Sequence, residues 1–231
     1  MESKLIDIPN NKLDEIINQN IEKSDKILIV VSFVFEKGLG LILDRLKKFH
    51  KPNNITIITS NYLKSTEPRA LRKLLDLKSL GSKLYLFDSL RSGENFHIKS
   101  YYFENEKNDF FSCIIGSSNI SFSAFKLSHE LNIETRSKKI ALAYKDKINN
   151  LLSNPQLLEL TEDVIHEYEK VYEENKNLIR KFEDEDSNEI TIIPFKKPNI
   201  IQIDALEILN SNRELGVKRG LVVMATGLGK T

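Results

Sequence analysis

The chain has 231 residues, of which 40% are hydrophobic and 29% are charged, and its formal net charge is +1. This composition is typical of a folded globular protein and excludes the disordered and collagen-like classes. The longest apolar stretch, Ile27–Phe35, is interrupted by Ser32 and is too short to cross a membrane. The N-terminus leads into no signal-peptide core, so we expect a cytoplasmic protein with no membrane partner.

Strand and helix patterns alternate along the N-terminal part of the chain. Apolar residues at helical spacing predict a first amphipathic helix, with Leu13, Ile16, Ile17 and Ile21 on its apolar face. Runs of β-branched residues and further helical patterns predict strands at 26–35, 55–60 and 83–87, and helices at 39–49 and 67–77. Strands that alternate with helices favour an α/β sandwich with parallel strands.

The pattern then predicts strands at 96–103, 111–115 and 130–135, with a helix at 120–127. Together the elements predict an α/β fold in which a mixed β-sheet is sandwiched by helices. The chain has one cysteine, Cys113, and it lies within an apolar strand. It cannot form an internal disulfide, and we expect it in the core.

An acidic helical extension follows the sheet elements. Asn154 and Pro155 resemble a helix cap with proline in the first turn, and apolar residues continue at helical spacing as far as Phe182. An acidic run at 183–188 then reads as a solvated linker. The apolar face of this helix either covers the sheet domain or pairs with a second subunit, and we favour the first alternative.

The small net charge hides an uneven distribution. Residues 1–153 carry 24 Lys and Arg against 18 Asp and Glu, a net charge of +6. Residues 154–190 carry 4 against 12, a net charge of −8, and residues 191–231 carry 6 against 3, a net charge of +3. The first segment is therefore mildly basic, as expected of a protein that binds a phosphate backbone.

The motif that carries the most chemical information is His97-x-Lys99, followed by Gly116-Ser117-Ser118-Asn119. Alternate residues of a strand share one face, so we expect His97 and Lys99 to point into one site. Cleavage of a phosphodiester without a metal needs an imidazole that attacks phosphorus and an ammonium that holds the phosphate charge. Small hydroxyl and amide donors such as those of the second segment are needed around the same oxygens.

Each residue also has a structural alternative. A single His-x-Lys on a strand usually has no function, and Asn119 alone is a candidate cap for the helix at 120–127. The two serines are ordinary turn residues, and Glu130 alone is an ordinary surface carboxylate. Their joint occurrence in this order, next to two predicted strands, favours the functional interpretation.

At these residues the sequence resembles the phospholipase D superfamily of "HKD" phosphodiesterases, in particular its nucleases with one motif per chain. The resemblance covers residues 1–153 and implies the phospholipase D fold. It also implies that His97 is the nucleophile, that Lys99, Ser117, Ser118 and Asn119 bind the phosphate, and that Glu130 orients the histidine. It implies neither a metal nor a cofactor for this phosphodiesterase.

Two features depart from the family pattern. The family has aspartate five residues after the lysine, where this chain has Glu104, and the interval before Gly116 is longer than usual. A matched acid for the leaving oxygen is also missing from one motif copy, because His50, His129 and His166 belong to no second copy. We therefore expect a homodimer that places two copies of His97 in one shared site.

A second motif lies at the end of the chain, in residues 191–231. A predicted strand runs into Ala225-Thr226-Gly227-Leu228-Gly229-Lys230-Thr231, which has the form of a phosphate-binding loop. With Met224 in place of the first glycine and Gln202 upstream, this segment resembles the start of a superfamily 2 DEAD/DEAH-type helicase domain. The resemblance assigns nucleotide binding to Gln202, Thr226, Gly227, Gly229, Lys230 and Thr231.

The expected organisation is a phospholipase D-like domain at 1–153, an acidic helix and linker at 154–190, and an incomplete helicase domain at 191–231. We expect no ATP hydrolysis, since ATP and magnesium would bind only to a complete helicase domain. The helicase-like segment favours DNA as the substrate and suggests a role in restriction or defence. The alternatives are a nucleic-acid-binding module that has lost catalysis, suggested by Glu104, and a lipid phosphodiesterase.

Overall fold

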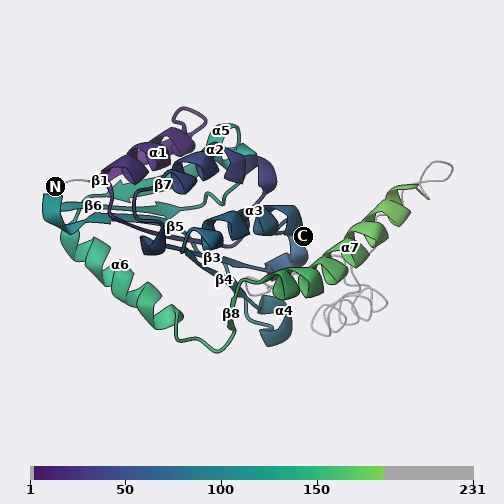
Figure 1. Ribbon diagram of the computed structural model, residues 1–231. Helices are drawn as coiled ribbons and strands as arrows, with labels where there is room; N and C mark the ends of the chain where they lie inside the picture. The colour runs from purple at the N-terminus through teal and green to yellow at the C-terminus, as the bar shows by residue number, and fades with distance from the viewer. Residues whose placement is uncertain (1–2, 185–231) are drawn as a thin grey trace, which may run out of the picture. The chain divides into compact units, whose positions relative to one another are not determined.

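The computed structural model describes residues 3–184 (Figure 1). The first two residues of the expected acidic linker, Glu183 and Asp184, belong to a helix, and the rest of the linker and the phosphate-binding loop lie outside the described residues. An eight-stranded sheet in the order β1-β7-β6-β5-β2-β3-β4-β8 forms the centre. The strands are β1 (Ser3–Ile8), β2 (Lys26–Val31), β3 (Ile55–Ser60), β4 (Lys83–Phe87), β5 (Lys99–Asn105), β6 (Phe110–Gly116), β7 (Glu130–Thr135) and β8 (Leu157–Glu159).

The sheet is mixed, as the sequence predicted. β2, β3 and β4 run parallel to one another, whereas β1, β5, β6, β7 and β8 pair antiparallel with their neighbours. Because of these directions, the C-terminal ends of β2, β3, β4 and β6 lie beside the N-terminal ends of β5 and β7, at the same end of the strands. All the motif residues expected to act together lie at this end of the sheet, which we call the motif edge.

Helices cover both faces of the sheet (Figure 1). α1 (Leu13–Lys23), α2 (Glu36–Lys47), α3 (Pro68–Ser79) and α5 (Phe122–Lys126) pack on one face, in a core with Ile29 of β2 and Phe103 of β5. α6 (Lys138–Leu151) packs on the other face, where its Ala141 and Ile148 belong to the same core as Val30 and Tyr102. The period of two in β2 and β5 therefore supplies alternate side chains to two cores.

The chain after α6 differs from the prediction. Asn154 does not cap a helix: its side chain accepts a hydrogen bond from the backbone of Gln156 in a turn that leads into β8. α7 (Glu162–Asp184) begins later, and its first turn is capped by the Thr161 hydroxyl, which accepts a bond from the Val164 N–H. A three-residue strand therefore precedes the acidic helix.

The first part of α7 packs on the sheet domain, which agrees with the alternative we favoured. Ile165 and Tyr168 are buried in the main core, and the Tyr168 hydroxyl donates to the Thr66 carbonyl at 2.7 Å. Arg72 of α3 forms a bidentate ion pair with Glu169 of α7. Residues up to Lys176 form one compact unit.

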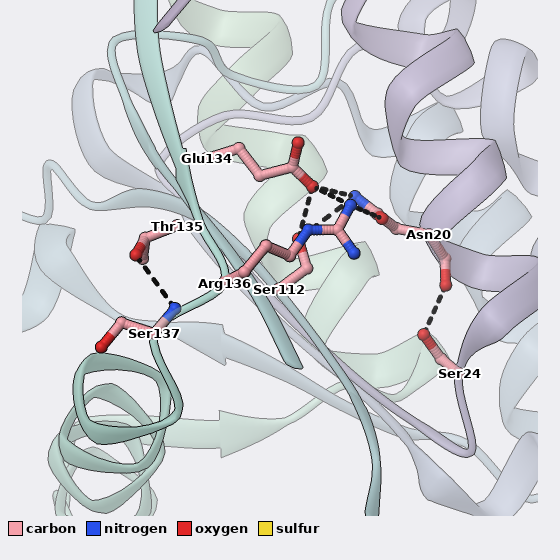
Figure 2. A network of polar contacts seen from close by, with 7 residues as sticks. All are labelled: Asn20, Ser24, Ser112, Glu134, Thr135, Arg136 and Ser137. Atoms are coloured by element: carbon pink, nitrogen blue, oxygen red, sulfur yellow. Dashed lines mark hydrogen bonds and ion pairs between the residues drawn. The ribbon is translucent and has the colours of Figure 1, made fainter. Parts of the chain in front are cut away.

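A buried polar network joins α1 to β6 and β7 (Figure 2). The Glu134 carboxylate is 6% exposed and accepts bonds from Asn20, Ser112 and Arg136 at 3.0, 2.8 and 2.7 Å. A buried carboxylate needs such donors, because the cost of removing it from water is otherwise uncompensated. The network fixes α1 against the end of the sheet that lies opposite the motif residues.

Several elements had no prediction from the sequence: β1, α4 (Ser89–Ser92), α6, β8 and the 3-10 turns at Pro52–Asn54, Tyr62–Lys64 and Glu106–Asn108. Cys113 is fully buried, as predicted, and burial raises the pKa of its thiol to about 12. Within residues 3–184, no helix is both long and apolar enough to cross a bilayer.

Candidate active site

The side chains of His97 and Lys99 are in contact. The predicted strand at 96–103 begins at Lys99 in the structure, so His97 lies just before β5 rather than within it. The Lys99 Nζ atom nevertheless lies 2.8 Å from Nδ1 of His97 and donates to the His97 carbonyl at 3.0 Å. The imidazole is exposed to solvent, whereas the lysine is only 8% exposed. A solvent-exposed imidazole thus lies in contact with a nearly buried ammonium group.

Ser32 positions Lys99, a role that the sequence did not reveal. It follows the last residue of β2, and its hydroxyl accepts from Lys99 Nζ at 3.2 Å and donates to the Ile98 carbonyl at 3.2 Å. The Ser32 carbonyl in turn accepts bonds from the hydroxyls of Ser60 and Thr66. The only sequence signal was a single hydroxyl residue at the end of an apolar strand.

Burial lowers the pKa of Lys99, and the nearby carboxylate of Glu130 partly opposes this shift. Glu130 opens β7 and is half-buried at the same edge of the sheet. Within the described residues, however, it forms no hydrogen bond to His97. The structure therefore places Glu130 close enough to act on the charge of Lys99, but not in the contact expected of a residue that orients the histidine.

Asn119 ties the loop after β6 to the end of β2. Its Oδ1 atom accepts from the Phe33 N–H at 3.0 Å, and Ile120 exchanges backbone bonds with Phe33 and Phe35. The helix cap proposed as an alternative for Asn119 belongs to Ser121, which accepts from the Ala124 N–H. Asn119 is thus held next to Ser32, the residue that positions Lys99. Within the described residues, its Nδ2 amide is still free to donate a hydrogen bond to a ligand.

The two serines of the motif lie in different environments. Ser117 is exposed, and its hydroxyl accepts from the Leu131 N–H at 3.1 Å. Ser118 is fully buried and bonds to the Asn132 amide at 2.9 Å. The structure therefore brings Ser117 to the surface of the site, whereas the Ser118 hydroxyl is enclosed beneath it.

Glu104 lies at the other end of β5, far from His97 along the strand. It is 2% exposed, and both of its carboxylate oxygens accept from Lys145 of α6 at 2.8 Å. Burial acts to raise the pKa of this carboxyl, but the bonds and charge of Lys145, together with contacts to Glu106 and Tyr102, outweigh burial and lower the pKa. The residue at the family's aspartate position therefore joins α6 to the sheet.

Two aromatic side chains line the approach to His97, and the sequence motif did not include them. The rings of Phe33 and Tyr62 lie edge-on to the imidazole, with centroids 6.3 and 5.9 Å away. The two rings are nearly parallel to each other, with a centroid distance of 6.2 Å. Lys99 Nζ lies 5.9 Å from the Phe33 centroid. Phe33 and Tyr62 follow the ends of β2 and β3. β2 is the neighbour of β5 in the sheet and β3 is the next strand beyond it, so both rings are distant from His97 in sequence.

No other histidine contacts this site within the described residues. His50 pairs with Asp25 near the start of β2, at the opposite edge of the sheet. His129 and His166 are exposed. Within the same part of the chain, no group of three or more His, Cys, Asp or Glu residues is arranged to hold a metal ion.

Comparison with known families and structures places this geometry in context. The family described as "Cardiolipin synthase, PLD-like domain" matches residues 17–152. NucT from Helicobacter pylori is 18% identical, with a TM-score of 0.54 over 68% of this chain and 98% of that one. NUC from Salmonella typhimurium, described as a phospholipase D family member, is 14% identical, with a TM-score of 0.53 over 68% and 97%.

Polyphosphate kinase from Porphyromonas gingivalis is 13% identical, with a TM-score of 0.52 over 67% of this chain and 26% of that one. Identities this low indicate a shared fold rather than a shared substrate. No curated protein sequence matches the chain.

Proposed function

The chain belongs to the family of PLD-like domains and has its phosphodiesterase fold, and from this premise we propose that it is a metal-independent nuclease that prefers DNA. The observation that carries the proposal is the contact between an exposed imidazole and a nearly buried ammonium, with Asn119 held beside them. This set supplies a nucleophile, a fixed positive charge and an amide donor at one edge of the sheet.

In the proposed reaction, a ring nitrogen of His97 attacks the phosphorus of a phosphodiester. The N–P bond forms as the bond from phosphorus to the leaving oxygen breaks, and an acid protonates that oxygen. Water then attacks the phosphohistidine and releases the phosphomonoester with the imidazole. Through both steps, Lys99 balances the charge of the non-bridging oxygens, and Ser117 and Asn119 donate hydrogen bonds to them.

Lys99 is fully engaged before substrate arrives. Its three N–H donors are directed to the Ser32 hydroxyl, His97 Nδ1 and the His97 carbonyl. An arriving phosphate therefore replaces at least one of these contacts, and the imidazole contact is the most exposed. Release from Lys99 would let Nδ1 carry a proton, so that Nε2 becomes the nucleophile and Glu130 becomes a candidate partner for Nδ1–H.

The acid for the leaving oxygen would come from a second copy of the chain. A strip of exposed apolar side chains supports this assembly. It lies on the same sheet face as α6, in the part of that face that α6 does not cover. Leu5 and Ile115 both lie opposite Ile133 in neighbouring strands, and the three are 57%, 46% and 51% exposed. Leu131 and Ile98 extend the strip towards the motif edge, and Ile98 is the neighbour of His97. A two-fold axis through this strip would bring two copies of His97 together.

The preference for DNA rests on the helicase-like sequence at 191–231, and the same pairing supports a role in restriction or defence. The alternative of a binding module that has lost catalysis drew its support from Glu104. That support is weakened, because Glu104 pairs with Lys145 away from the motif edge. The lipid alternative remains an outcome of the experiment below.

The test is a cleavage assay with the purified chain in excess EDTA, using labelled single- and double-stranded DNA, RNA and phospholipid vesicles. We expect DNA cleavage and a covalent protein–DNA adduct that is stable to alkali and labile to acid, as a phosphoramidate bond is. His166→Ala, which alters an exposed histidine on α7, is the matched control for His97→Ala. A requirement for a divalent metal, or cleavage of lipid alone, would contradict the proposal.

A further inference from the structure

A hollow of about 380 Å³ lies beside the candidate nucleophile. One wall is the turn Tyr62–Lys64 after β3, and the other consists of Ser89 and Leu90 of α4 and the segment 93–95. Tyr62 links the hollow to the site, because its ring contacts the imidazole of His97. Ligands of open α/β sheets bind outside the C-terminal ends of the strands, which is where this hollow lies.

Asn61 holds the two walls together. Its side-chain amide donates to Asp88 at 2.8 Å, and its Oδ1 accepts from the Leu90 N–H at 3.1 Å. Asn61 is 5% exposed and its carbonyl accepts from the Lys64 N–H. One buried amide therefore connects the turn after β3 with the helix after β4, so the hollow is built into the fold.

The turn that forms the first wall has an unfavourable backbone. Leu63 and Lys64 are consecutive non-glycine residues with φ of 53° and 52°. Such conformations cost free energy and persist where the surrounding structure imposes them, often at sites that clamp a ligand. Here they leave Leu63 61% exposed at the rim, an arrangement that hydrophobic burial does not explain.

The lining suits a flat, uncharged group with polar edges. Tyr62, Leu63 and Leu90 supply apolar surface, while Lys64 and Glu94 bring opposite charges that favour neither an anion nor a cation. Asn95 offers an amide at the same hollow. The hydroxyl of Ser89 is buried and has no hydrogen-bond partner among the described residues. An acyl chain would leave these polar groups unpaired, whereas a nucleobase would pair with some of them.

We propose that this hollow is a subsite for a nucleobase, namely the base of a nucleotide adjoining the scissile phosphate. With the phosphate at His97 and Lys99, the base would lie against Tyr62, whose ring is already supported by Phe33. Stacking on an aromatic ring accepts every base, so the subsite would favour unpaired bases without reading sequence. The inference rests on the proposed nuclease function and adds the part of the substrate that is held.

The test measures binding rather than cleavage, with the full chain carrying His97→Ala so that the DNA stays intact. The probes are a fluorescent oligothymidylate and the same strand with abasic sugars throughout. Tyr62→Leu should weaken binding of the oligothymidylate by about fivefold or more, as loss of a base stack does, and leave the abasic strand nearly unaffected. Tyr62→Phe keeps the ring and should bind as the parent does.

Two further variants protect the test against a folding artefact. Leu90→Trp, at a position that is 40% exposed, fills the hollow and should reproduce the base-dependent loss. Leu80→Ala, at a 44% exposed position at the end of α3, is the control and should change nothing. Equal loss on both probes, or no loss with Tyr62→Leu, would overturn the subsite, as would tighter binding of phospholipid vesicles than of DNA.

The two proposals fail separately. If the chain with His97 intact cleaves DNA but the base-dependent loss is absent, the subsite is wrong and the nuclease function stands. If it cleaves no phosphodiester but the base-dependent loss is present, the nuclease function is wrong and the subsite stands as a DNA-binding element.

Discussion

The Nδ1 atom of His97 accepts a hydrogen bond from the ammonium of Lys99 across 2.8 Å, although His97 lies outside the strand that carries Lys99. The contact arises because β5 begins only where Ser32 holds the lysine, so the residues before it turn towards the end of β2. One hydroxyl thus holds the proposed phosphate ligand next to the proposed nucleophile.

His97→Ala should abolish cleavage while leaving the fold intact, because the imidazole is exposed and supports no core contact. Loss of a covalent nucleophile costs orders of magnitude in rate. Rates on labelled DNA, together with thermal melting, check the prediction, and His166→Ala is the control. Near-normal cleavage by His97→Ala would contradict the assignment of the nucleophile.

Lys99 should give cleavage an alkaline limit below pH 10.5, since burial lowers its pKa from that ordinary value. The rate should fall as pH rises through the lowered pKa, because the neutral amine no longer holds the phosphate charge. An active Lys99→Arg variant should retain its rate to higher pH, because guanidinium stays charged. Pre-steady-state rates between pH 7 and about 10.5 test this, and an unchanged profile in Lys99→Arg would exclude Lys99 as the titrating group.

The same shift predicts how stability depends on pH. Between the lowered pKa and 10.5, the unfolded chain binds more protons at Lys99 than the folded chain does. The free energy of unfolding contributed by this residue therefore rises with pH across that window. Denaturant titrations of the parent and of Lys99→Met should differ in this slope, and parallel pH profiles would contradict the burial argument.

Glu104→Gln should destabilise the fold by about 3 kcal/mol but spare cleavage, because it removes the buried charged partner of Lys145 and leaves only the longer contact with Glu106 at 3.6 Å. The Glu104 carboxyl has a lowered pKa, so its contribution is present above 4.5 and is lost as pH falls through the lowered value. Denaturant melts at neutral and acid pH measure this, with exposed Glu167→Gln as control. Lost cleavage in a stably folded Glu104→Gln variant would instead indicate a catalytic role.

Gly116→Ala should destabilise the fold by roughly 1–3 kcal/mol, the usual cost of overpacking. An added Cβ would lie 2.3 Å from Asn132 Oδ1 and 2.4 Å from the Leu131 carbonyl oxygen, so β7 would have to move. Gly40→Ala is the matched control, since Gly40 meets nothing within 4 Å and a helical alanine stabilises by about 0.5–1 kcal/mol. Equal melting temperatures for the two variants would refute the argument.

The sequence predicted β3 and β4 to the residue, because each is a run of strand-forming residues with clear ends, and it placed a further strand near the observed bounds of β7. It could not predict β8, which has three residues and exists only through its pairing with β4. Likewise, Asn154-Pro155 has the local form of a helix cap, but the pairing with β4 keeps the following residues extended. Tertiary pairing prevailed over local pattern there.

The sequence identified only some residues of the candidate site, because the others are brought there by tertiary pairing. A motif identifies residues that are close in sequence, such as His97 and Lys99. Ser32, Phe33 and Tyr62 reach the site only because β2 inserts between β5 and β3 in the sheet, a non-local pairing that no spacing reveals. The hollow beside Tyr62 depends in the same way on contacts between the ends of β3 and β4.

The last prediction concerns assembly. In the proposed mechanism one chain supplies His97 as the nucleophile, and no second histidine of the described residues lies at the site to act as the acid that the leaving oxygen needs. A second copy docked on the apolar strip would supply it, and sedimentation should therefore show a dimer. Ile133→Lys places a charge at a 51% exposed position in the strip and should give folded, inactive monomers, while Leu80→Lys, just after α3, should change neither property.

Crosslinking then tests the position of the two-fold axis. Cys113 is fully buried, so in an Ile98→Cys variant a short bifunctional maleimide reports on position 98, next to His97. The two copies should crosslink at high yield, and Ile133→Lys in the same chain should remove the crosslinked product. A monomer that cleaves DNA at full rate, or a dimer that crosslinks only through distant positions, would refute the shared site, because each histidine would then act without the other.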